Sequence, residues 1–106
     1  MMPLAIAAAL LLQSSGLSLT VDRAWTEQIG SNSVGRVLVT VTNNAARSFE
    51  WIMVDCTLSL NGSPVETARA SLHNVRRGQA ASATATVWNT HEFDSASCRI
   101  GPVSGS

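Results

Sequence analysis

The sequence predicts an all-β fold, a small antiparallel β-sandwich of immunoglobulin-like type with six to seven strands, preceded by a signal-peptide helix. Three observations support this prediction. The chain has 106 residues, which is enough for one small domain. Apolar residues recur at every second position along most of it, as they do in half-buried strands. Turn-forming residues separate these alternating runs, a spacing that is typical of a sandwich.

The first segment, residues 1–16, has the layout of a secretory signal peptide. Residues 4–12 read LAIAAALLL, and small or polar residues follow at 13–16, although no Lys or Arg precedes the run. A spanning helix needs about 20 apolar residues, roughly twice this run, so the alternative that remains is a buried helix. We expect cleavage after Gly16, with Ser15 and Ser18 as alternative positions, a mature domain over residues 17–106, and no membrane span after cleavage.

The mature part of the chain alternates with period two. The alternating stretches lie at residues 17–21, 37–41, 52–60, 68–72, 81–88 and 98–100. Between them stand turn residues, of which Asn61-Gly62 is a strong hairpin signal because both residues tolerate positive φ. Residues 80–85 are rich in alanine and have helix propensity, but their alternation with Ser and Thr favours a strand.

The two cysteines, Cys56 and Cys98, both fall on faces that the alternation turns inward. In an oxidising compartment two such cysteines are expected to form a disulfide. For a loop of about 40 residues, the chain-entropy model gives about 4 kcal/mol of stabilisation. The alternative is a pair of buried free thiols that pack as small apolar groups. The alternation does not determine whether the two cysteines lie on facing strands of the two sheets or on neighbouring strands of one sheet.

Composition and motifs argue against several functions. Seven basic and seven acidic residues give a formal net charge of zero. This balance argues against a nucleic-acid partner or an anionic membrane surface, since both select a basic face. The chain has no Gly-x-Ser-x-Gly elbow and no convincing acid–base pair. We therefore expect no catalytic residues, no enzymatic activity, no cofactor and no metal.

Two alternative functions involve the histidines: one uses His73 and His91 directly, and the other uses the loop that contains His91. A small metal-handling protein would use His73 and His91, with Met53 as a further ligand, although their spacing is not that of a known metal motif. An inhibitor of a secreted hydrolase would present residues 89–95, the longest polar break in the mature chain.

Trp51, Met53 and Trp88 are the candidate partner-binding residues. They alternate with the aliphatic core positions, so we expect their side chains to point outward. An outward Trp can anchor a partner. The competing interpretation is that a Trp at a strand end covers the edge of the core, and Trp25 falls under it as well. The first functional hypothesis is therefore a non-enzymatic binding or structural module that acts on a protein or a cell-envelope component. The sequence does not determine its oligomeric state.

The middle of the chain carries four segments in a fixed order: VTVTNN at 39–44, FEWIMV at 49–54, CTLSLNGSPV at 56–65 and HNVRRGQ at 73–79. In this order they resemble the FxLYD-type domain, a small β-sandwich module of bacteria that lies outside the cytoplasm. The resemblance covers residues 36–88. It implies an accessory or interaction module in the periplasm or the secreted fraction, and no shared catalytic residues.

Overall fold

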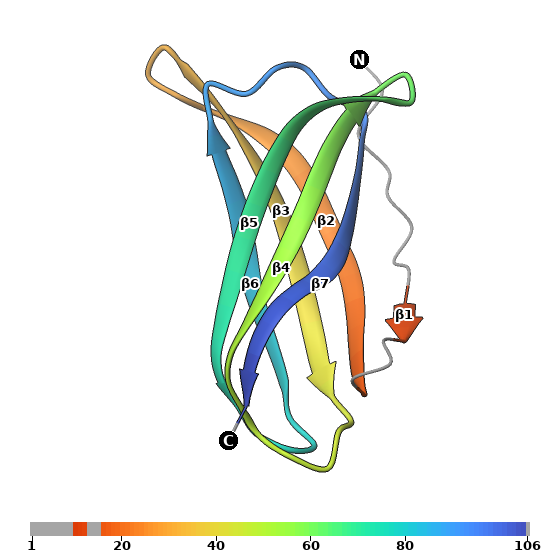
Figure 1. The fold of residues 1–106 in the computed structure, drawn as a ribbon. Helices are drawn as coiled ribbons and strands as arrows, with labels where there is room; N and C mark the ends of the chain where they lie inside the picture. The colour runs from red at the N-terminus through yellow and green to blue at the C-terminus, as the bar shows by residue number, and fades with distance from the viewer. Residues whose placement is uncertain (1–9, 13–15, 106) are drawn as a thin grey trace.

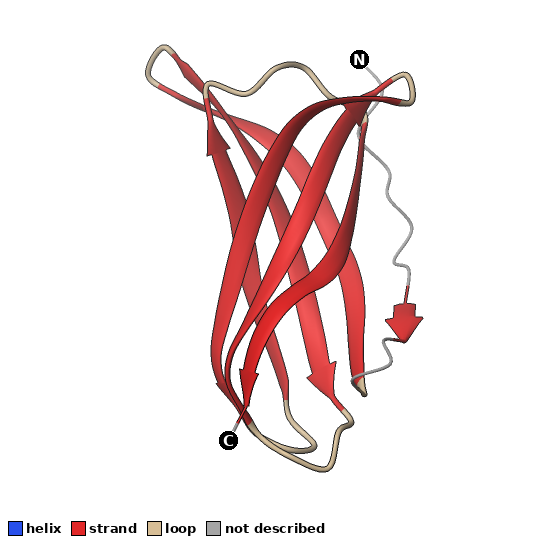
Figure 2. Ribbon diagram, in the orientation of Figure 1, coloured by secondary structure: helices blue, strands red, loops and turns tan. Residues whose placement is uncertain are grey.

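The computed structural model describes residues 10–12 and 16–105, and within these residues it forms strands, turns and loops but no helix (Figure 1, Figure 2). The strands are β1 (Leu10–Leu12), β2 (Leu17–Ile29), β3 (Asn32–Asn43), β4 (Phe49–Leu60), β5 (Ser63–Val75), β6 (Ala80–Trp88) and β7 (Ser95–Gly105). They pair antiparallel in two sheets, β1-β2-β3-β6 and β5-β4-β7, which pack face to face. The predicted all-β sandwich is confirmed.

The predicted signal-peptide helix lies mostly outside the described residues, which omit 1–9 and 13–15. Within that segment Leu10–Leu12 form β1, a short strand on the edge of β2, rather than part of a helix. In the part of the chain that the structure describes, no helix has the length and hydrophobicity needed to cross a membrane.

The hydrophobic core lies between the two sheets and includes most of the alternating positions that the sequence predicts, together with Ala24, Phe49, Val75 and Phe93, which the alternation does not predict. On β4 these are Ile52, Val54, Cys56 and Leu58, each at most 1% exposed. From the other sheet Leu17, Leu19, Val37, Val39 and Val41 face them, all fully buried. Val and Leu are the commonest residues of this core, and their branched aliphatic side chains fit the pleated, buried surface of a strand.

Cys56 and Cys98 form a disulfide, and both half-cystines are buried. They are register partners on the neighbouring strands β4 and β7, with Cα atoms 4.0 Å apart. The bond therefore joins two strands of one sheet, and it does not join the two sheets. Among the described residues there is no free cysteine.

Asn43 organises the end of the sandwich at the bottom of Figure 1, where β3 ends and the β5–β6 turn lies. Its side chain is fully buried. The Nδ2 atom donates to the carbonyls of Arg47 (2.9 Å) and Val75 (3.1 Å), and Oδ1 accepts from the backbone N–H of Ala45 (2.9 Å). The Asn43 backbone also bonds to the β5–β6 turn in both directions, through Gln79 and Gly78. The side chain of Asn43 thus joins the β3–β4 loop to the end of β5, and its backbone adds the β5–β6 turn.

Candidate functional site

The three predicted partner-binding residues do point outward, but they lie on opposite faces of the sandwich. Trp51 and Met53 are on β4, on the outer face of the β5-β4-β7 sheet. Trp88 ends β6, on the outer face of the other sheet. The structure therefore does not bring these three side chains into one surface.

Trp88 instead shares its face with an aromatic residue and an aliphatic residue from β2. Register partners in an antiparallel sheet point to the same side. One such row is Glu27, Val34 and Trp88, and the next is Trp25, Arg36 and Thr86. Ile29 lies two residues beyond Glu27 on β2 and so belongs to this face too. We call the set the Trp88 patch, and its members are Trp25, Glu27, Ile29, Val34, Arg36 and Trp88.

The Trp88 patch contains the large apolar side chains that are most exposed in the described structure. Trp88 is 54% exposed and Ile29 is 38% exposed, and no other large hydrophobic side chain among the described residues is classed with them. Val34, which lies between Glu27 and Trp88 in the register, is completely buried although it is on the outer side of the sheet. The surface side chains of this row therefore pack closely enough to cover it.

Charged groups hold the tryptophan of β2 in place. The Arg23 guanidinium lies over the Trp25 ring, 4.4 Å from its centroid, and Trp25 Nε1 donates to Glu27 Oε1 at 3.3 Å. The same Glu27 oxygen lies 3.3 Å from Arg36 Nε, and Arg36 also donates to the hydroxyl of Thr86. Arg23 makes no ion pair with any described residue.

A β-bulge explains why Trp25 points outward. Leu17, Leu19 and Val21 face the core, and strict alternation would turn Trp25 inward as well. Between Val21 and Arg23 the register shifts by one residue, and Ala24 takes the inward place instead. The alternation in the sequence does not reveal this shift, and it predicts for Trp25 only a role in covering the edge of the core.

The outer face of the β5-β4-β7 sheet contains a surface depression with a volume of about 580 Å³. Asp55 stands in its centre between two register partners, Arg69 on β5 and Arg99 on β7. Arg69 Nε donates to Asp55 Oδ1 at 2.6 Å, and this hydrogen bond raises the pKa of the Arg69 guanidinium. The neighbouring row consists of three hydroxyl residues, Thr57, Thr67 and Ser97.

His73 and His91 are not close to each other. His91 Nδ1 lies 2.6 Å from Glu66 Oε2, near the start of β5, whereas His73 is seven residues further along that strand. At about 3.3 Å per residue this separates the two histidines by roughly 20 Å. One metal ion cannot bind both, since a metal–nitrogen bond is about 2 Å long. No cluster of three His, Cys, Asp or Glu side chains with metal-binding geometry occurs among the described residues.

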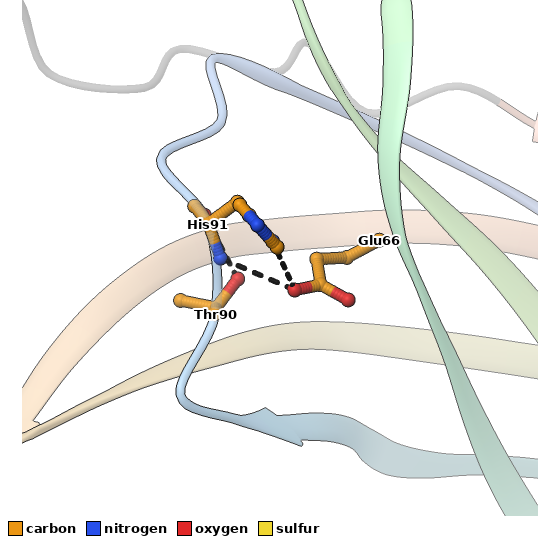
Figure 3. Close-up of polar contacts among 3 residues, drawn as sticks. All are labelled: Glu66, Thr90 and His91. Atoms are coloured by element: carbon orange, nitrogen blue, oxygen red, sulfur yellow. Dashed lines mark hydrogen bonds and ion pairs between the residues drawn. The ribbon is translucent and has the colours of Figure 1, made fainter.

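The β6–β7 loop, the alternative site for inhibiting a hydrolase, is fastened at several points. Its His91 binds Glu66 through both the imidazole Nδ1 and the backbone N–H, as Figure 3 shows beside Thr90. The side-chain hydrogen bond to His91 is the main reason that the pKa of Glu66 is lowered from 4.5. Phe93 is buried, and the Asp94 carboxylate accepts from the backbone N–H of Asn61. The side chains of His91 and Glu92 are nevertheless exposed.

No family model, no curated protein and no solved structure matches the chain. The FxLYD-type resemblance therefore stays a prediction from the sequence.

Proposed function

We propose that the chain is a secreted or periplasmic, non-enzymatic binding module that recognises a protein through the Trp88 patch. The observation that carries this proposal is the gathering of Trp88, Ile29 and Trp25 on one face of one sheet. Tryptophan and arginine are the residues most enriched at energetic centres of protein interfaces. Exposed apolar surface that gathers in one place commonly marks an interaction site.

The chemistry of the patch indicates the kind of surface that fits it. Trp88 and Ile29 present apolar area that a partner side chain can cover. Arg23 lies beside them on Trp25 and has no carboxylate among the described residues, whereas Arg36 is already near Glu27. A protein that offers an apolar side chain next to an Asp or Glu complements this pattern of charge.

The extracytoplasmic location is supported by the disulfide and by the signal-peptide layout of residues 1–16. Intact mass of the exported protein tests it. The expected mass lacks residues 1–16 and two hydrogen atoms. A full-length chain with two free thiols would overturn the location.

The binding proposal is tested by photo-crosslinking in the producing cells, with a photoreactive residue in place of Ile29. We expect a specific adduct that is lost when Trp88→Ser is added. Trp51→Ser removes an outward tryptophan from the opposite sheet and serves as the matched control, for which the adduct should persist. An adduct that survives Trp88→Ser would rule out the patch, and the absence of any adduct in the wild-type background would rule out the binding module. Circular dichroism confirms that each variant is folded.

A second candidate function is inhibition of a secreted hydrolase by the β6–β7 loop. The observation that favours it is the fastening of the loop, since a loop that is already held in its bound shape loses less entropy on binding. Screening the purified protein against secreted proteases and glycosidases, with Glu92→Ala as the variant, tests this candidate. The absence of inhibition across the panel would remove it.

A further inference from the structure

The depression on the outer face of the β5-β4-β7 sheet has the composition of a ligand site and lies on the opposite side of the sandwich from the Trp88 patch. Its outward side chains are entirely polar, and they come from all three strands. They are Asp55, Thr57, Thr67, Arg69, Ser97 and Arg99. The inward residues Cys56, Ala68 and Cys98 border the same depression and contribute its floor.

The charges in this depression do not cancel. Asp55 carries one negative charge, and Arg69 and Arg99 on either side carry two positive charges. The hydrogen bond to Asp55 uses only the Nε of Arg69, which leaves its terminal N–H groups without a partner among the described residues. The Arg99 side chain makes no hydrogen bond or ion pair with any residue that the structure describes. The site therefore offers several free guanidinium donors and a surplus charge of +1.

The backbone of β7 makes room for the central carboxylate. A Cβ atom placed on Gly101 would lie 2.6 Å from Asp55 Oδ2. With glycine at this position, one carboxylate oxygen rests against β7 while the other accepts the hydrogen bond from Arg69. Asp55 therefore lies across the sheet between the two arginines.

This combination of groups fits an acidic saccharide better than other ligands. Guanidinium forks bind carboxylate and sulfate oxygens in a bidentate manner. The Asp55 carboxylate can accept hydrogen bonds from the hydroxyl groups of sugars, and the hydroxyls of Thr57, Thr67 and Ser97 can both donate to them and accept from them. A peptide anchor would need an apolar pocket, which these side chains do not form. Nucleic acid would need a larger positive charge than this site or the whole chain carries.

The same face extends beyond the depression in a direction that suits a chain-like ligand. Met53 and Trp51 follow Asp55 on β4 with their side chains on the outer side. Trp51 is four residues from Asp55, or about 13 Å along the strand. Its half-buried ring has an apolar surface against which a sugar ring can pack. The face is thus long enough for an oligosaccharide rather than for a single sugar.

We propose that the β5-β4-β7 face binds an acidic oligosaccharide, whose carboxylate or sulfate group pairs with Arg99 and Arg69 and whose hydroxyl groups contact Asp55 and the Thr57 row. The proposal is independent of the Trp88 patch, which lies on the other sheet.

Isothermal titration with three oligosaccharides of equal length tests the proposal: one of uronic acids, one sulfated and one neutral. We expect binding of at least one acidic oligosaccharide, weakened at least about tenfold by Arg99→Gln, since one charge-assisted hydrogen bond contributes that much or more. The two acidic arms show whether the carboxylate or the sulfate is preferred. Arg77→Gln, an exposed arginine in the β5–β6 turn, is the matched control and should leave the affinity unchanged.

Three results would overturn the proposal: no binding of either acidic oligosaccharide, equal binding of the neutral one, or unchanged affinity in Arg99→Gln. Trp88→Ser separates this proposal from the preceding one, because it should abolish the protein adduct and leave oligosaccharide binding intact. Arg99 is exposed and unpaired within the described structure, so Arg99→Gln should fold normally.

Discussion

Replacing Asn43 by alanine should destabilise the domain by about 3 kcal/mol. The side chain makes three hydrogen bonds to backbone groups, at 2.9, 3.1 and 2.9 Å. Each such bond contributes about 1 kcal/mol net to the free energy of unfolding. The alanine variant would leave the three backbone groups without this partner beside a side-chain position that is fully buried. Since 1 kcal/mol shifts the Tm of a domain of this size by about 4–8 °C, the Tm should fall by about 12–24 °C.

Urea denaturation followed by tryptophan fluorescence measures this change directly, with differential scanning calorimetry for the Tm. Asn44→Ala is the matched control, because the neighbouring asparagine is exposed and its side chain makes a single hydrogen bond, to Ser18 Oγ. We expect that control to cost less than about 1 kcal/mol. If Asn43→Ala cost no more than Asn44→Ala, the role assigned to the buried amide would be refuted.

Three further predictions follow from the fold. Reduction of the disulfide, whose cysteines are 42 residues apart, should lower the free energy of unfolding by about 4 kcal/mol in urea titrations with and without reductant; a loss below about 1 kcal/mol would contradict it. The pKa of Glu66 is depressed in the folded state, so its contact with His91 stabilises the folded loop above pH 4.5 and this contribution declines as the pH falls through the folded pKa. A carboxyl NMR titration of Glu66 should therefore have its midpoint below 4.5, and a midpoint at or above 4.5 would exclude the effect. A Cβ on Gly35 would lie 3.1 Å from Thr90 Oγ1 and 3.3 Å from Phe93, so Gly35→Ala should cost about 1–3 kcal/mol and speed hydrogen exchange in the β6–β7 loop. Unchanged exchange would show that the loop tolerates the added methyl group.

Most of the fold could be predicted from the sequence, because one face of each strand is buried and the other is not. Period two therefore identified the inward residues of β4, such as Val54 and Cys56, and the Asn61-Gly62 turn has the positive φ values expected of it, 52° and 83°. The disulfide followed from there being only two cysteines, both on inward positions.

The candidate sites were harder to predict, because they depend on strand order and on a change of register. Alternation indicates that Trp51 and Trp88 point outward, but only the assignment of β4 and β6 to different sheets shows that they lie on opposite faces. The bulge at Asp22 reverses the alternation within β2 and moves Trp25 to the outside. The sequence feature that marks the bulge is that the apolar alternation ends at a charged residue, Asp22. This feature alone does not predict a bulge.

Only part of the row of Arg69, Asp55 and Arg99 could have been assembled from the sequence. Asp55 and Arg69 lie on the two strands of the hairpin that Asn61-Gly62 predicts. Arg99 lies on β7, which is far from β4 in the chain, and its place beside Asp55 follows from a strand pairing that the sequence does not indicate. The burial of Asn43 was also missed, because an asparagine at the end of a strand usually indicates only an exposed turn.

The position of the disulfide between two paired strands has a mechanical consequence. β7 is an edge strand, and a force that pulls on its C-terminal end would separate it from β4 one hydrogen bond at a time, beginning at Gly105. That unzipping would stop at Cys98, where a covalent bond passes the load to Cys56 in the central strand of the sheet. Further extension would then have to shear β4 out from between its neighbours, which requires many hydrogen bonds to break together. The last strand can therefore yield over its final seven residues while the rest of the sandwich keeps its shape.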